Sequence, residues 1–187
     1  MRSFVSCVLD RSGSMGSDGK IEEAIGGFNK FLREQKSNIP EAELLVTIFD
    51  DSVDEYYRGK LKDCPELTEK VFFPRGMTRL NDAIGETIAK TLASSYSDED
   101  KGIILVITDG AENSSREYGG DAIKSMIQEG KDKGWDFIFL GCDASVIGQA
   151  QDFGFRGSQY DDSSDGVRIA YTSMVSDVTS YFHSAQK

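Results

Sequence analysis

Short apolar runs alternate along the chain with segments whose apolar residues recur at helical spacing. Four runs are apolar nearly throughout and rich in Val, Ile and Phe, which is typical of strands buried on both faces of a parallel sheet. These runs are FVSCVL (4–9), LLVTIF (44–49), IILVIT (103–108) and WDFIFLG (135–141). The pattern predicts four core strands.

Helices are predicted between and after these strands. Apolar residues that recur at i, i+3, i+4 and i+7 indicate amphipathic helices, and they fall within 21–32, 80–92, 122–127 and 167–182. The sequence SVDEYYRGKL (52–61) follows a strand after a tight DDS turn, so we expect an antiparallel edge strand there. A last, short strand is expected within 152–160.

Strands that alternate with helices predict an open α/β sheet with helices on both faces. We expect a doubly wound, mostly parallel, Rossmann-like sheet with one antiparallel edge strand. Because crossovers are right-handed, the strand order must reverse once, and ligands bind beyond the C-terminal strand ends at that point. A closed barrel would need more βα units than the sequence contains. With no repeat or linker in evidence, residues 1–187 are predicted to form a single domain.

The charge balance limits the classes of partner. With a net charge of −11 and a pI of about 4.6, the surface should repel nucleic acid and anionic membranes and attract cations. No apolar run approaches the roughly 20 residues of a membrane-spanning helix. The N-terminal MRSFVSCVLD reaches charge within ten residues and lacks a small-residue cleavage site, so we interpret it as a core strand. We expect neither a nucleic-acid nor a membrane partner.

The three cysteines, Cys7, Cys64 and Cys142, are odd in number and lack metal-like spacing. Two of them lie in or beside apolar strands, which favours buried free thiols. Free thiols are typical of reducing compartments, so a cytoplasmic location is expected.

Candidate chemistry begins in VLDRSGSMG, where a strand reaches Asp10 and is followed by Ser12 and Ser14. Asp109 has the same position after another strand, in VITDGAENSS, and Thr78 stands before a helix in FPRGMTRLNDAI. If the two strands are neighbours, two carboxylates face each other at the switch point. Carboxylate and hydroxyl oxygens select a hard cation. A site with only a few direct anionic ligands suits Mg²⁺, with Mn²⁺ or Ca²⁺ as alternatives.

These three loops resemble those of the von Willebrand factor A domain family. DRSGS resembles its D-x-S-x-S loop, GMTRLNDAIGE its threonine loop and ITDGAEN its T-D-G loop, in the family's order. The match of strands and helices extends from residue 3 to about 185. The family's metal-ion-dependent adhesion site (MIDAS) uses these loops. One departure is RGMT, where relatives frequently have a second glycine and this chain has Met77.

The resemblance implies a role for each matched residue. Ser12, Ser14 and Thr78 would contact the metal directly or nearly so, while Asp10 and Asp109 would hold it through water or exchange with direct ligation. Family members bind a partner protein whose Asp or Glu completes the metal's shell. Members inside cells often work within larger assemblies. The resemblance therefore implies a Mg²⁺-dependent protein-binding module that is not an enzyme.

Each of these residues also has a purely structural interpretation. Asp10, Ser12 and Ser14 suit a polar turn or a helix N-cap, and Thr78 suits the cap of a helix that begins at Arg79. Asp109 with Gly110 is a common turn dipeptide.

Neighbouring residues are open to similar alternatives. Asp82 either hydrogen-bonds the threonine loop or stabilises a helix N-terminus. Arg11 and Met15 either touch a partner or are solvated loop residues. We expect Asp50 and Asp51 to be turn residues and His183 to lie on the surface.

Two other functions stay open. One is a structural subunit that uses its helices, without metal-dependent binding. The other is a Mg²⁺-dependent phosphatase-like hydrolase with a nucleophilic aspartate. Such enzymes need a second acid two residues after the first, and this chain has Ser12 there. The sequence thus favours a binding module over an enzyme.

Overall fold

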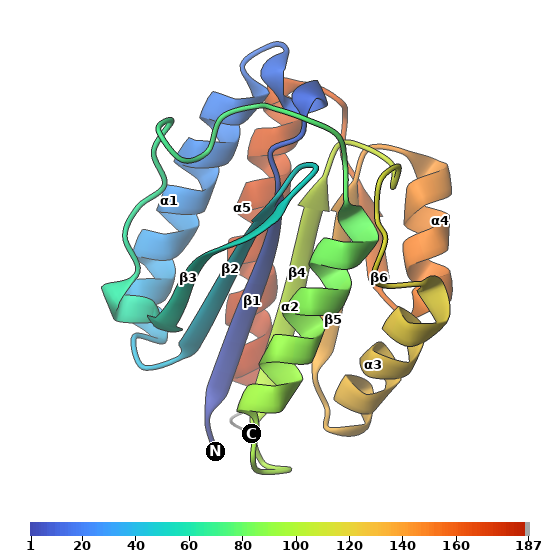
Figure 1. Cartoon of the computed structure of the whole chain (residues 1–187). Coiled ribbons are helices and arrows are strands. Elements are labelled where there is room, and N and C mark those ends of the chain that lie inside the picture. The colour runs from blue at the N-terminus through green and yellow to red at the C-terminus, as the bar shows by residue number, and fades with distance from the viewer. Residues whose placement is uncertain (186–187) are drawn as a thin grey trace.

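The computed structural model describes residues 1–185 and contains one six-stranded sheet (Figure 1). The strand order is β3-β2-β1-β4-β5-β6, and only β3 runs antiparallel to its neighbour. The predicted fold class, including its antiparallel edge strand and its short last strand, is confirmed. The strands are β1 (Ser3–Asp10), β2 (Glu43–Phe49), β3 (Val53–Lys60), β4 (Lys101–Thr108), β5 (Asp136–Gly141) and β6 (Arg156–Gln159).

Residues 1–185 also form five α-helices and two 3₁₀ turns, all of which lie between strands except α5, which follows β6. They are η1 (Gly13–Gly16), α1 (Lys20–Asn38), η2 (Leu61–Asp63), α2 (Leu80–Ser94), α3 (Gly120–Asp132), α4 (Ala144–Phe153) and α5 (Ser164–Ala185). In the described range 1–185, none of the helices combines the length and the apolar character that a membrane span requires.

Helix α4 was not predicted from the sequence, because its apolar stripe is short. Its boundaries nevertheless carry ordinary cap residues. The Asp143 carboxylate accepts hydrogen bonds from the backbone N–H groups of Ser145 and Val146, and Gly154 ends the helix with a φ of 112°. An acidic N-cap and a left-handed C-terminal glycine are the usual signals of a helix.

The helices form one layer on each face of the sheet. Helices α1 and α5 cover one face, and α2, α3 and α4 cover the other (Figure 1). The central strands contribute side chains to both cores, which explains why they are apolar nearly throughout. Helices α1 and α5 pack closely because Gly27 has no side chain: a Cβ there would lie 2.5 Å from that of Tyr171.

The strand order reverses between β1 and β4, which are parallel neighbours. From β1 the chain continues to β2 and β3 on one side, whereas β4 leads to β5 and β6 on the other. The C-terminal ends of β1 and β4 therefore meet at the switch point, as predicted. The loops that follow them gather at this edge of the sheet.

Candidate metal centre

Asp10 is the last residue of β1 and is 1% exposed. Its two carboxylate oxygens contact different elements. One accepts a hydrogen bond from the backbone N–H of Ser12 (2.6 Å), and the other accepts one from the hydroxyl of Thr108 at the end of β4 (2.6 Å). Asp10 thus joins the loop after β1 to the neighbouring strand.

Among the described residues, 1–185, none offers the Asp10 carboxylate a cationic hydrogen bond. Burial raises its pKa from 3.8 to about 6, and the nearby negative charge of Asp109 acts in the same direction. Hydrogen bonds from Ser12 and Thr108 oppose this increase in pKa. A buried carboxylate with this electrostatic balance would be stabilised by a nearby cation.

Three side-chain oxygens converge beyond Asp10. The hydroxyls of Ser12 and Ser14 lie 3.2 Å apart, and the Ser14 hydroxyl donates to Oδ1 of Asp109 at 2.6 Å. Ligands about 2.1 Å from an octahedral Mg²⁺ lie about 3.0 Å from their neighbours. The distance between the two serine hydroxyls is close to one edge of such a coordination shell, whereas the Ser14–Asp109 pair is a short hydrogen bond that a bound cation would replace.

Thr78 lies on the same hollow and is not a helix cap. Helix α2 begins at Leu80 with Arg79 at its N-cap position. Instead, the backbone of Thr78 exchanges two hydrogen bonds with Asn113, one to its side-chain oxygen (2.8 Å) and one from its N–H (3.1 Å). These bonds tie the threonine loop to the loop after β4.

The hollow has a volume of about 350 Å³ and opens at the C-terminal edge of the sheet. Its lining combines all three predicted loops: Ser12, Gly13, Ser14, Gly76, Met77, Thr78, Gly110, Ala111 and Asn113. In residues 1–185 no group of three or more His, Cys, Asp or Glu is placed to hold a metal. A donor set of two carboxylates and three hydroxyls suits a hard cation that retains water, such as Mg²⁺.

The two loops that border the hollow are held together by their backbones. Gly13 N–H donates to the carbonyl of Gly76 (3.1 Å), and Arg75 N–H donates to the carbonyl of Arg11 (3.0 Å). A Cβ on Gly13 would lie 3.3 Å from that carbonyl of Gly76. Gly13 is thus needed for close approach of the two loops.

The expectations for Arg11 and Met15 were wrong. Neither is a solvated or partner-facing residue: Arg11 is 5% exposed and Met15 is 1% exposed. Met15 belongs to the core beneath helix α1. Arg11 donates from Nε to Asp50 (2.8 Å) and from a terminal nitrogen to the carbonyl of Val71 (2.7 Å).

Asp50 is a turn residue, as predicted, but it is also the centre of a buried ion-pair cluster. Its Oδ2 accepts hydrogen bonds from the Nε atoms of Arg11 (2.8 Å) and Arg75 (2.6 Å). Its Oδ1 accepts from the N–H and hydroxyl of Ser52. Asp51 is exposed, as a turn residue is expected to be, and so is His183.

Asp82 has features of both of its interpretations: it is an acid in the first turn of α2, and it accepts hydrogen bonds from Arg79 of the threonine loop. It lies in the first turn of α2, but its carboxylate accepts backbone hydrogen bonds from Arg116, Glu117 and Tyr118. It also pairs with Arg79. Burial raises its pKa, but these hydrogen bonds outweigh burial and leave the pKa below its usual value. Asp82 therefore ties the loop after β4 to Arg79 of the threonine loop.

Sequence reasoning missed Thr108, Asn113 and Lys20. Thr108 had a usable signal, because parallel register places it opposite Asp10 once β1 and β4 are known to be neighbours. Lys20 had none: its Nζ approaches Asp109 Oδ2 (3.2 Å) from the start of α1. The three cysteines are free thiols, two buried and one half-buried, as expected.

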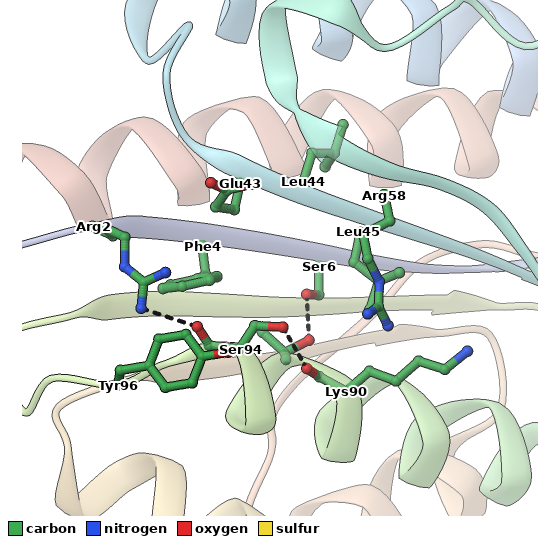
Figure 2. Close-up of a pocket in the computed structure, with 11 residues that line it drawn as sticks. Arg2, Phe4, Ser6, Glu43, Leu44, Leu45, Arg58, Lys90, Ser94 and Tyr96 are labelled. Atoms are coloured by element: carbon green, nitrogen blue, oxygen red, sulfur yellow. Dashed lines mark hydrogen bonds between the residues drawn. The ribbon is translucent and has the colours of Figure 1, made fainter.

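A second hollow, of about 240 Å³, lies at the other end of the sheet between α2 and the strands β1 to β3 (Figure 2). Arg2, Arg58 and Lys90 line it, together with Phe4 and Tyr96. Each of the three cations already pairs with a carboxylate of this chain: Arg2 with Asp100, Arg58 with Glu55, and Lys90 with Glu55 and Glu86. This hollow therefore offers no uncompensated charge to a ligand.

Comparison with known proteins supports the fold. No protein-family model matches the sequence, and neither does any curated protein. Among solved structures, the pilus adhesin SpaC from Lactobacillus rhamnosus GG in its open conformation is similar over 95% of this chain (TM-score 0.68, 14% identity). The chain spans 30% of the length of SpaC.

Two further structures carry the family in their names. The ArnB paralog VWA2 from Sulfolobus acidocaldarius aligns over 90% of this chain and 44% of its own (TM-score 0.61, 20% identity). The vWF domain of the type V pili tip protein Mfa5 from Porphyromonas gingivalis aligns over 95% of both chains (TM-score 0.65, 11% identity). The chain has the fold of von Willebrand factor A domains.

Proposed function

We propose that this protein is a divalent-metal-dependent protein-binding module. Ser12, Ser14 and Thr78 would hold Mg²⁺ through their hydroxyls, and Asp10 and Asp109 would support it directly or through water. A bound Mg²⁺ supplies an electron-poor open position for the Asp or Glu side chain of a partner protein. The observation that carries this proposal is the convergence of the Ser12, Ser14 and Asp109 oxygens beside the buried Asp10, whose carboxylate has no cationic partner within residues 1–185.

The chain's own residues fix this donor set. Thr108 and the backbone of Ser12 hold both oxygens of Asp10, so its side chain cannot swing away from the loop. Asn113 fixes the backbone of Thr78. Ser14 is exposed, so the donor set is open to a partner on that side. Preorganised oxygens of this kind bind a cation without a large ordering cost.

An apolar rim beside the hollow supports a protein partner. Val71, Phe73 and Met77 are 38%, 40% and 52% exposed, and all three belong to the segment that borders the metal loop. Exposed apolar side chains grouped beside a polar site are typical of protein-interaction surfaces. We expect the partner's acidic residue to be flanked by bulky apolar residues that contact this rim.

The hydrolase alternative has less support. A phosphatase of this kind needs a second acid two residues after its nucleophilic aspartate, and after Asp10 this chain has Ser12 there. At the position two residues later, the Ser12 hydroxyl cannot act as a carboxylic general acid. The structural-subunit alternative differs from the proposal in using the helices as its contact surface and in its independence from metal.

Calorimetric titration with Mg²⁺ tests the metal step. The double variant Ser12→Ala/Ser14→Ala removes two donors, whereas Ser17→Ala removes a nearby exposed hydroxyl and serves as the matched control. We expect the double variant to bind Mg²⁺ at least about tenfold more weakly, since each lost ligand is replaced by water, and the control to bind normally. An unchanged affinity in the double variant would contradict the proposal.

Affinity capture from a lysate of the source organism tests the partner step. The parent chain in Mg²⁺, the parent in EDTA, and the double serine variant in Mg²⁺ are compared. The proposal expects a partner that is retained only in the first sample. A partner retained in all three samples would instead establish the structural-subunit function.

A further inference from the structure

Lys20, the first residue of α1, is 3% exposed and contacts two of the metal loops. Its Nζ donates to Oδ2 of Asp109 (3.2 Å) and approaches the backbone carbonyl of Ser14 (3.4 Å). It also pairs with Asp162, in the loop that leads into α5. A buried ammonium thus touches two of the three metal loops.

The two oxygens of Asp109 have different partners. Oδ1 accepts from the hydroxyl of Ser14, which lines the hollow, while Oδ2 accepts from Lys20. Asp109 can therefore contribute Oδ1 to a cation while Oδ2 stays paired. Burial acts to lower the pKa of Lys20, but its hydrogen bonds to Asp162 and Asp109 outweigh burial and leave the pKa raised. The ammonium is charged at neutral pH.

We propose that Lys20 is a positioning residue that also tunes the charge of the metal centre. It holds Asp109 and the Ser14 carbonyl in place, lowers the affinity of the empty centre for a free cation, and strengthens the grip of the bound cation on a carboxylate ligand. This inference rests on the proposed function. Its physical basis is that a fixed positive charge repels Mg²⁺ but offsets the anionic donors that would repel a partner carboxylate.

The proposal predicts effects of opposite sign from one substitution. In Lys20→Met, Mg²⁺ should bind at least about fivefold more tightly, because a nearby positive charge is lost. Acetate, as a minimal carboxylate probe, should bind the metal-loaded variant more weakly. A purely structural lysine would not produce this opposition, since a disordered site loses both affinities together.

Lys60→Met is the matched control for net charge. Lys60 is partly exposed and pairs with Glu43, away from the metal loops. Both variants lose one positive charge, so a general effect of protein charge appears equally in the two. We expect Lys60→Met to stay within about twofold of the parent in both measurements.

A second pair of variants avoids a substitution in the interior. The side chain of Asp162 is 61% exposed and pairs with Lys20, whereas its exposed neighbour Asp161 supplies a control of equal charge change. Asp162→Asn leaves the ammonium less neutralised, so Mg²⁺ should bind more weakly than in Asp161→Asn. Acetate should bind the metal-loaded Asp162→Asn variant more tightly than the control.

The measurements are Mg²⁺ calorimetry on the full chain and broadening of the acetate methyl resonance by protein-bound Mn²⁺. If the parent binds no Mg²⁺, both the proposed function and the role of Lys20 fail. If the parent binds but Lys20→Met binds Mg²⁺ equally or more weakly, the role of Lys20 is overturned while the proposed function stands. If Lys20→Met does not fold, the aspartate variants decide: equal dissociation constants of Asp162→Asn and Asp161→Asn for Mg²⁺ and for acetate would overturn the role of Lys20.

Discussion

Asp10 and Asp50 occupy matching places in the fold but have opposite electrostatics. Asp10 ends β1 and Asp50 follows β2, which is the adjacent parallel strand. Their exposures are 1% and 0%. Asp50 contacts two guanidinium groups, whereas Asp10 contacts only a hydroxyl and a backbone N–H through its hydrogen bonds.

The pKa values of the two carboxyls move in opposite directions. Burial raises both, but hydrogen bonds from Arg75, Ser52 and Arg11 outweigh it at Asp50 and hold that pKa well below its usual range. At Asp10 burial prevails and the pKa rises to about 6. The chain supplies its own cations to the structural carboxylate and leaves the other short of positive charge. That difference separates a folding element from a candidate cation site.

Replacing each carboxylate by its amide gives the largest expected contrast. Asp50→Asn removes the buried carboxylate that pairs with Arg11, whose guanidinium then keeps only the half-exposed Asp54 as an anionic partner. Breaking a buried pair costs about 3 kcal/mol of unfolding free energy or more. Asp10→Asn removes a charge that burial disfavours, so in EDTA at pH 7 its unfolding free energy should equal or exceed that of the parent. Urea unfolding in EDTA measures both values.

Urea unfolding repeated in excess Mg²⁺ provides the control. A cation that binds only the folded state stabilises the parent by about 2.7 kcal/mol at 100 times its dissociation constant. We expect the parent to gain this stability from Mg²⁺. The Ser12→Ala/Ser14→Ala variant and Asp10→Asn should not gain it. If Asp10→Asn loses as much stability in EDTA as Asp50→Asn does, the two carboxylates are equivalent and the comparison fails.

The pH dependence of stability sharpens the contrast between the two sites. A carboxyl whose folded pKa is raised keeps its proton in the folded state while the unfolded chain loses it. In EDTA, Asp10 should therefore cost the folded state stability as pH rises from 3.8 to about 6, by up to about 3 kcal/mol. The cost is complete above pH 6 and absent below pH 3.8.

Asp50 contributes with the opposite sign. Its depressed pKa gives stability that is present at neutral pH and lost as pH falls below its ordinary value. Subtracting the stability-versus-pH profile of Asp10→Asn from that of the parent, both in EDTA, isolates the contribution of Asp10. A difference that does not change between pH 4 and 7 would contradict the raised pKa of Asp10.

Most of the fold could be predicted from the sequence, because periodicity reports burial directly. Strands with both faces covered are apolar throughout, and the helices of one covered face show a 3.6-residue stripe. Helix α4 was missed because ten residues carry only a short stripe. Its signals were local, in the caps at Asp143 and Gly154, and cap residues also occur in simple turns.

The site could be predicted only in part, for a different physical reason. Asp10, Ser12, Ser14, Thr78 and Asp109 follow strands or precede a helix, so the topology alone brings their loops together; their ligation of a metal stays a prediction. Arg11 and Lys20 were misjudged or missed because burial of a charged side chain depends on partners distant in sequence. Asp50, Asp54 and Asp162 provide those partners, and no periodic pattern reports such pairs.

The smallest expected effects come from the hydroxyls that donate to each carboxylate. Thr108→Val removes the donor to Asp10, and Ser52→Ala removes a donor to Asp50. A hydrogen bond to a charged group contributes about 1.5 kcal/mol or more, so Thr108→Val should lose about that much at pH 7 in EDTA. Ser52→Ala should lose only about 0.5 kcal/mol, because two guanidinium groups and the backbone N–H of Ser52 still satisfy Asp50.

Repeating these measurements at pH 4.5 distinguishes the two donors. There Asp10 is protonated in the folded state, so the Thr108 hydroxyl no longer serves an anion and the cost of Thr108→Val should shrink. A part of the cost remains, since the backbone N–H of Gly110 also donates to that hydroxyl. The cost of Ser52→Ala should stay constant, because Asp50 is still ionised. Equal pH responses in the two variants would show that Asp10 is held as an anion without any added cation, and the candidate metal centre would lose its electrostatic basis.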